Sequence, residues 1–236
     1  MNNTYYETLD ENFTQALKLY EQNFTHEELI ELLKNGNIVQ KQIAALRLET
    51  VKSVEDGNVL LANLTGQDGK IREAVSLRLN EFMADFQLIN FFKNPKNYKI
   101  FLDAVIDING NICRNIIGAI TNLRNDAEFC SIFCENLVEL TYSLLNIIEQ
   151  MDFQDGKYKV NKEVFKLYWC LETVFVFWDK LKFDDLKQII LRSKDIEEYT
   201  IREKAAKILA LGFDDEQLIS ARSDLQNDRN YYVRRF

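Results

Sequence analysis

The stretch "GKIREAVSLRL" at residues 69–79 has a close counterpart in "YTIREKAAKIL" at residues 199–209. In both stretches an isoleucine precedes an arginine, and further apolar residues follow every three to four positions. These apolar positions are Ile71, Val75 and Leu79 in the first stretch and Ile201, Ala205 and Ile208 in the second. Residues at this spacing share one face of a helix. Each stretch therefore predicts a helix that buries one face.

Four more segments open in a similar way, at residues 37–46, 111–120, 158–167 and 230–236. The six apolar anchor positions are Val39, Ile71, Cys113, Val160, Ile201 and Val233, at spacings of 32, 42, 47, 41 and 32 residues. Second apolar helices are predicted between the openers, at 25–36, 128–150, 183–194 and 214–225. A period of roughly 30 to 50 residues with two helices per unit indicates an α-solenoid.

The openers place Asp or Asn before a Val/Ile-Arg pair and Ala-rich and Leu-rich turns after it. In this they resemble HEAT repeats, above all the short bacterial kind. The resemblance covers most of the chain and is weakest over 96–180, where the units are longer. It implies an all-α, right-handed α-α superhelix of about five to six helix pairs. We expect a single domain: acidic capping helices at 1–36, HEAT-like repeats at 37–226, and a truncated repeat or C-terminal cap at 227–236.

In repeats of this kind the arginine after the anchor usually packs along the neighbouring helix and donates hydrogen bonds to turn residues. The positions that match are Arg72, Arg114, Arg202 and Arg234, whereas Gln40 and Asn161 replace the arginine in two units. The alternative is a row of arginines that binds phosphates. The structural interpretation is favoured because these residues begin helices in register with the packing anchors.

The composition agrees with a helical, acidic protein. One proline and eight glycines in 236 residues are too few for the many tight turns of an all-β fold. The formal net charge is −8, and residues 1–31 hold seven carboxylates against one lysine. An acidic protein repels phosphate backbones, so nucleic acid is a disfavoured partner and a basic protein or peptide a favoured one.

The N-terminal residues lack the charged and apolar segments of a signal peptide, and no apolar run reaches the length of a membrane span. We therefore expect a cytoplasmic protein without membrane contact, whose four cysteines are reduced. Those cysteines are Cys113, Cys130, Cys134 and Cys170. Cys130 and Cys134 share a helix face and suit a metal site by type, but their apolar neighbours favour core packing.

Few residues suggest chemistry, and we expect neither a cofactor nor a metal. His26, the only histidine, is predicted at an exposed position early in an acidic helix. The aromatic segment at 158–178 is apolar almost all round, which indicates either the most buried helix or a binding patch with Trp169 or Trp178. "MDFQDGKYKV" at 151–160 reads as a loop, with a hairpin turning at Asp155-Gly156 as the alternative.

The favoured function is a non-enzymatic interaction or scaffold module that binds a partner through the concave face of the solenoid. The candidate contacts are Glu27, Glu31, Glu135, Glu139, Trp169 and Trp178. One alternative is a HEAT-like alkylpurine DNA glycosylase, in which Trp169, Trp178 and Asp179 meet the lesion. A second is an accessory or inhibitor subunit of another enzyme. The acidic charge weighs against the glycosylase, because the only basic cluster is Arg222, Arg229, Arg234 and Arg235.

Overall fold

The computed structural model describes residues 3–153 and 157–236, and within these ranges the chain is all-α, with no strand. The contacts divide the chain into two compact units. Unit 1 contains residues up to 104 together with 114–122, and unit 2 contains residues 105–113 and 123–236. The assignment of the whole chain to one domain stays a prediction, and each unit is described separately.

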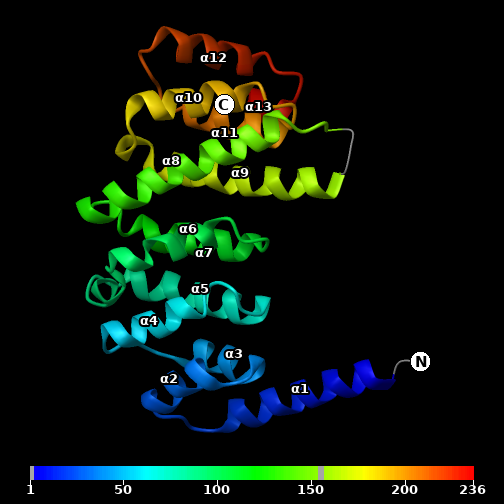
Figure 1. The fold of residues 1–236 in the computed structure, drawn as a ribbon, viewed down its shortest axis with the longest axis vertical. Helices are drawn as coiled ribbons and strands as arrows, with labels where there is room; N and C mark the ends of the chain where they lie inside the picture. The colour runs from blue at the N-terminus through cyan, green and yellow to red at the C-terminus, as the bar shows by residue number, and fades with distance from the viewer. Residues whose placement is uncertain (1–2, 154–156) are drawn as a thin grey trace. The chain divides into compact units, whose positions relative to one another are not determined.

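Unit 1 is built from helices and two short 3-10 turns. Its first five helices are α1 (Asn3–Glu21), α2 (His26–Asn35), α3 (Ile38–Arg47), α4 (Val54–Ala62) and α5 (Gly69–Ala84). Two 3-10 turns follow, η1 (Leu88–Phe92) and η2 (Pro95–Asn97). The boundary with unit 2 runs through α6 (Tyr98–Val105) and α7 (Gly110–Thr121): unit 1 contains α6 up to Ala104 and α7 from Arg114. In Figure 1 these elements run from blue to green. Helix α3 packs on α2, α1 and α5, and α2 packs on α4.

Unit 2 continues from the first turn of α7. Its other elements are α8 (Ala127–Glu149), α9 (Lys157–Phe177), the 3-10 turn η3 (Trp178–Lys180), α10 (Phe183–Lys194), α11 (Tyr199–Leu209), α12 (Glu216–Gln226) and α13 (Tyr231–Arg234). Alternate helices stack in two rows: α9, α11 and α13 form one, and α8, α10 and α12 form the other. Sequential pairs join the rows, which is the packing of an ARM/HEAT-like α-solenoid.

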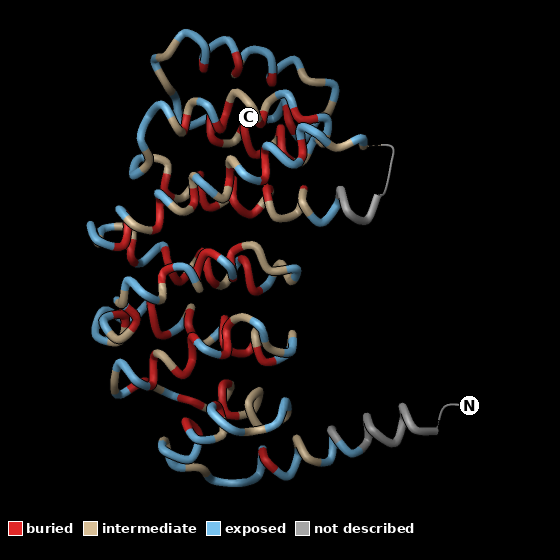
Figure 2. Tube along the Cα trace, viewed as in Figure 1, coloured by how far each residue is buried: buried red, intermediate tan, exposed pale blue. Residues whose placement is uncertain are grey.

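The anchor residues set the phase of the repeat. They lie in alternate helices, namely α3, α5, α7, α9, α11 and α13. The anchors Ile71, Cys113, Ile201 and Val233 are all at most 2% exposed. Figure 2 shows the same pattern along the trace, with buried residues on the helix sides that meet other helices of the unit. The α-solenoid class is therefore confirmed, and so are the second helices predicted at 25–36, 128–150, 183–194 and 214–225. Helices α4 and α6 were not predicted.

Local signals at several helix ends are also confirmed. Thr25 and Glu28 form the predicted capping box of α2. Gly212 follows α11 with a φ of +88°, a conformation that favours glycine. Asp184 and Asp185 lie in the first turn of α10, where the helix dipole favours negative charge.

The loop expected at 151–160 and the hairpin given as its alternative are both wrong over 157–160, because Lys157 already begins α9 and these residues are helical. Residues 154–156, with the Asp155-Gly156 pair on which the hairpin depended, lie outside the described residues. Helix formation prevails here because α9 packs along α8 and α11, whereas an isolated hairpin has little to pack against.

Helix α4 carries a glycine in its interior, which weakens the sequence signal for a helix. The structure supplies the reason. A Cβ at Gly57 would stand 2.7 Å from the carbonyl oxygen of Phe91. The glycine lets α4 approach η1 at this point, and Phe92 of the same turn is fully buried.

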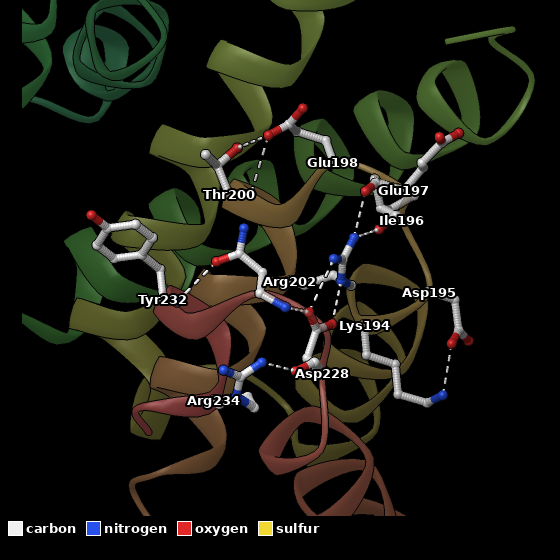
Figure 3. A network of polar contacts seen from close by, with 11 residues as sticks. Lys194, Asp195, Ile196, Glu197, Glu198, Thr200, Arg202, Asp228, Tyr232 and Arg234 are labelled. Atoms are coloured by element: carbon white, nitrogen blue, oxygen red, sulfur yellow. Dashed lines mark hydrogen bonds and ion pairs between the residues drawn. The ribbon is translucent and has the colours of Figure 1, made fainter.

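Arg202 shows most clearly what the arginine after an anchor does (Figure 3). Its Nε donates to Asp228 Oδ2 at 2.7 Å and one terminal nitrogen donates to Asp228 Oδ1 at 3.2 Å. The other terminal nitrogen donates to the carbonyls of Ile196, at 2.9 Å, and Glu197. The ion pair is buried, with the two side chains only 9% and 10% exposed. Arg202 thereby ties the turn before α11 to the turn before α13.

The other predicted ladder arginines lie at the matching places. Arg72 donates to the carbonyl of Gln67, in the turn before its own helix. Arg234 donates to the carbonyl of Asp228 at 2.6 Å, six residues earlier in the chain. Arg114 is exposed on α7. Arg72 and Arg234 thus contact the turn before their own helix, and the role of Arg114 as a turn-bracing residue stays a prediction.

Replacement of Arg202 tests the buried pair. We expect Arg202→Ala to lower the free energy of unfolding by about 3 kcal/mol, because Asp228 is left buried without its counterion. The measurement is urea unfolding followed by circular dichroism. Arg235→Ala is the matched control: its ion pair with Glu203 leaves the guanidinium side chain 44% exposed, so its loss should cost under about 1 kcal/mol. Equal losses for both variants would contradict the buried bridge.

The same pair predicts a pH dependence. The hydrogen bonds from Arg202 lower the pKa of Asp228 below the ordinary aspartate range. A carboxyl group with a lowered native pKa stabilises the fold above its unfolded pKa, and this contribution is lost as the pH falls through the native value. We expect Asp228→Asn to be less stable than the natural chain at pH 7 and the difference to shrink as the pH falls below about 4. A difference that stays constant with pH would contradict the assignment.

Candidate functional site

A groove in unit 2 runs between α8 and the η3–α10 segment. It has a volume of about 520 Å³. Its lining residues are Cys130, Ser131, Cys134, Glu135, Val138, Glu139 and Tyr142 from α8, and Lys180, Leu181, Lys182 and Asp185 from the other side. The α8 residues recur at intervals of three to four, so one continuous stripe of the helix forms a wall. The groove therefore arises from the stacking of two successive helices of the same row.

The two walls carry opposite charges. Glu135 and Glu139, four residues apart on α8, are exposed, and neither has an intramolecular ion pair among the described residues. On the opposite wall Lys180 and Lys182 are exposed, with Lys180 Nζ 3.6 Å from the carboxylate of Asp179. Free carboxylates on one side and ammonium groups on the other give the groove a polarity across its width.

The floor is less polar than the walls. Cys134 is buried, and Val138 and Leu181 are half-buried. The Tyr142 hydroxyl lies 3.2 Å from Asp185 Oδ1, the carboxylate that accepts its hydrogen bond. Burial, and then the negative charge of Asp185, raise the pKa of Tyr142, so the phenol keeps its proton. One end of the groove is therefore closed by a neutral tyrosine.

Polar contacts beyond Tyr142 hold the two helices at this separation. Arg192 of α10 donates from Nε to Glu149 Oε1 at 2.8 Å and from a terminal nitrogen to Glu149 Oε2 at 2.6 Å. The terminal nitrogen also donates to Asn146 Oδ1 at 2.7 Å. A bidentate arginine–carboxylate contact restricts geometry more than a single hydrogen bond does. The groove is thus a preformed feature of the stack.

The thiols at the floor are unsuited to nucleophilic chemistry. Burial raises the pKa of Cys134 to about 12 and also raises the pKa of Cys130. Cys130 Sγ in addition donates to the carbonyl of Arg124 at 3.1 Å. The thiolate is the reactive form of cysteine, so both residues serve as small apolar groups in packing.

The structure brings two of the predicted contact residues together and separates the rest. Glu135 and Glu139 line the groove, whereas Glu27 and Glu31 are exposed on α2 in unit 1. Trp169 was wrongly placed in a binding patch, because it is only 8% exposed. Its indole packs edge-on against Tyr168 at 5.3 Å, and a Cβ at Gly110 would stand 3.2 Å from its ring. The apolar surface of α9 is thus covered by its neighbours within the unit.

Trp178 is half-buried and lies edge-on against Phe213, with ring centroids 5.8 Å apart. Asp179 forms an ion pair with Arg124 in addition to its contact with Lys180. A base-binding site made of Trp169, Trp178 and Asp179 would need an accessible aromatic face and a free carboxylate. The burial of Trp169 and the pairing of Asp179 argue against such a site.

The prediction that His26 is an exposed surface residue is wrong. Its side chain is 13% exposed, and Nε2 lies 2.9 Å from Asp56 Oδ2. Asp56 also accepts from the backbone N–H of Lys52 at 2.8 Å. The acidic surroundings of His26 in the sequence gave no sign of this contact, because Asp56 lies thirty residues away on α4 and approaches only through the stacking of α2 and α4.

Sequence reasoning missed Tyr142 on α8 and the whole second wall of the groove, namely Lys180, Leu181, Lys182 and Asp185. The only local signal was the alternation of lysine and leucine at 180–182, immediately before the acidic start of α10. That pattern marks an exposed turn but does not show which helix it faces. The pairing of this turn with α8 is a tertiary contact.

The described ranges contain neither a metal-binding cluster nor a helix suited to spanning a membrane. No group of three or more His, Cys, Asp or Glu side chains there is arranged to hold a metal ion. No described helix has both the length and the apolar character needed to cross a membrane.

No family model and no curated protein matches the sequence. The chain is similar to two artificial proteins of known structure. An engineered protein, solved as a structural genomics target, is 14% identical over 89% of this chain and 92% of its own, with a TM-score of 0.45. A designed armadillo repeat protein is 15% identical over 88% of this chain and 94% of its own, also with a TM-score of 0.45. The fold assignment itself rests on the helix contacts within the two units.

The protonated, covered thiols predict slow modification of the native protein. A pKa of about 12 leaves roughly one thiolate in ten thousand at pH 8. All four cysteines are buried, so we expect a disulfide reagent to modify them slowly in the folded protein and rapidly in urea. Ser131→Cys, an exposed position on the same wall, is the control that should react at once. Rapid modification of one or two natural thiols in the folded protein would contradict the assignment.

Proposed function

We propose that the protein is a non-enzymatic interaction module that binds a peptide segment of a partner protein in the α8–α10 groove. The observation that carries this proposal is the pair of free, exposed glutamates, Glu135 and Glu139, facing exposed lysines across a less polar floor. α-Solenoids commonly use the surface of one helix row to hold a partner. A volume of about 520 Å³ lies within the range of sites that accept several side chains.

The chemistry of the groove specifies the segment it would take. An apolar side chain of the segment contacts Val138 and Leu181 at the floor. A lysine or arginine on one edge pairs with Glu135 or Glu139, and a carboxylate on the other edge pairs with Lys182. Opposite charges on the two walls favour one orientation of the bound segment and disfavour the reverse one.

The surroundings of the groove support binding rather than catalysis. Its thiols are protonated and its tyrosine donates to Asp185, so these groups are poor bases and nucleophiles. The four buried, unpaired cysteines suit a reducing compartment, and we include a cytoplasmic location in the proposal.

Selection from a library of short displayed peptides tests the proposal with the intact chain as bait. We expect the selected peptides to combine an apolar residue with lysine or arginine. The affinity of a selected synthetic peptide, measured by fluorescence anisotropy, should fall about tenfold or more in Glu139→Lys, because the basic residue then faces a like charge. Lys182→Glu should weaken peptides that carry an acidic residue on the opposite edge.

Glu128→Lys is the matched control. Glu128 is an exposed glutamate on the same helix, and the change in net charge is the same, but its position is outside the groove lining. It should leave the affinity nearly unchanged. If Glu128→Lys and Glu139→Lys weaken binding equally, the peptides respond to overall charge and the groove is not their site. The proposal would also be overturned if no displayed peptide bound the folded chain.

A further inference from the structure

An apolar stripe lies exposed on α1, the helix that packs outside α3 in unit 1. Phe13, Leu17 and Tyr20 are 62%, 49% and 71% exposed. Their spacing of four and three residues places them on one face of the helix. Leu19, on a different face, is 8% exposed and belongs to the core. Helix α1 thus buries one side within unit 1 and presents a second apolar side to solvent.

A second apolar surface is exposed at α12 and α13 in unit 2. Ile219 is 55% exposed, and Tyr231 and Tyr232 are 66% and 52% exposed. The tyrosine rings lie 5.7 Å apart, and Tyr199 adds a third ring 6.3 Å from that of Tyr232. Exposed apolar clusters of this kind are typical of interaction surfaces.

The two surfaces carry opposite charges. On α1 and α2 the exposed acidic residues Glu11, Glu21, Glu27, Glu28 and Glu31 outnumber the exposed Lys18 and Lys34. Over residues 216–236, which hold α12 and α13, Arg222, Arg229, Arg234 and Arg235 stand against Glu216, Asp224 and Asp228. Asp228 is paired with Arg202, and Arg235 is paired with Glu203, which leaves three arginines against two carboxylates. The surface at α12–α13 is therefore basic and aromatic, and the surface at α1–α2 is acidic and apolar.

We propose that the α1–α2 surface of one copy of this chain binds the α12–α13 surface of a second copy, so that the protein associates head to tail. A second copy offers both the apolar side chains and the charge that each surface lacks. The contact would repeat between molecules the side-by-side helix packing that stabilises each unit. The α1–α2 and α12–α13 surfaces contain none of the residues that line the α8–α10 groove.

A symmetric contact between two α1–α2 surfaces has the opposite electrostatics. It would bring the glutamates at 21, 27 and 28 of both copies together, and like charges across an interface are unfavourable. A head-to-tail contact is heterologous, because it joins two different surfaces of the chain. A symmetric contact would be lost on changing α1 alone and would be indifferent to changes at α13, so variants of the two surfaces distinguish the two arrangements.

Sedimentation velocity of the full chain over a range of concentrations tests the proposal. We expect the mean mass to rise with concentration above that of a monomer, and the association to weaken as salt screens the charges. Leu17→Glu should weaken association about tenfold or more, because an apolar contact is lost and a carboxylate is added. Tyr231→Glu should do the same from the other surface. Phe86→Ser, which removes an apolar side chain that is 79% exposed elsewhere, is the matched control and should leave association unchanged.

Mixing the two variants gives the decisive result. Leu17→Glu retains a working α12–α13 surface and Tyr231→Glu retains a working α1–α2 surface, so an equimolar mixture should form a heterodimer that grows no further. Circular dichroism and urea unfolding establish that each variant is folded. A wild-type chain that stays monomeric at every concentration would overturn the proposal. So would association that ignores salt, or that responds to Leu17→Glu but not to Tyr231→Glu.

Discussion

The structure depends on one constraint: a single pair of amphipathic helices cannot cover its own apolar face. Each pair must pack on the next, and the anchor residues of alternate helices form the buried seam that results. Ile201 and Val233 belong to this seam in unit 2, where both are at most 1% exposed. Arg202 adds a polar brace at the same point, because its hydrogen bonds join the turns that precede α11 and α13.

Stacking also creates the candidate site. Successive helices of the second row diverge enough around η3 for side chains of α8 and the start of α10 to enclose a groove. The contacts of Arg192 with Glu149 and Asn146 hold the two helices together, so Glu139 and Lys182 stand on opposite walls before any partner binds. Preorganised charges of opposite sign favour selectivity, because a reversed segment meets like charges on both walls.

The same constraint gives the self-association proposal its physical basis. A helix inside a row packs against the helix before it and the helix after it. Helix α1 has an exposed apolar stripe, so it has surface left to pack against one more helix. At α12 and α13 the exposed tyrosines and Ile219 likewise leave apolar surface uncovered, and the charge around them is opposite to that around α1. Apolar burial provides the attraction, and charge decides which surfaces meet.

The sequence by itself determined the helical class, the alternation of two helix rows and the positions of the anchors, because helical periodicity and capping are local properties. It also placed Glu135 and Glu139 on an exposed face. It did not reveal α4, whose Gly57 is explained only by the nearby Phe91 carbonyl, or the contact of His26 with Asp56. The burial of Trp169 and the facing of Lys180 and Lys182 toward α8 were likewise decided by tertiary structure. Those features depend on which helices pack together. Helical periodicity reports only the spacing of nearby residues, so it does not show contacts between residues thirty to fifty positions apart.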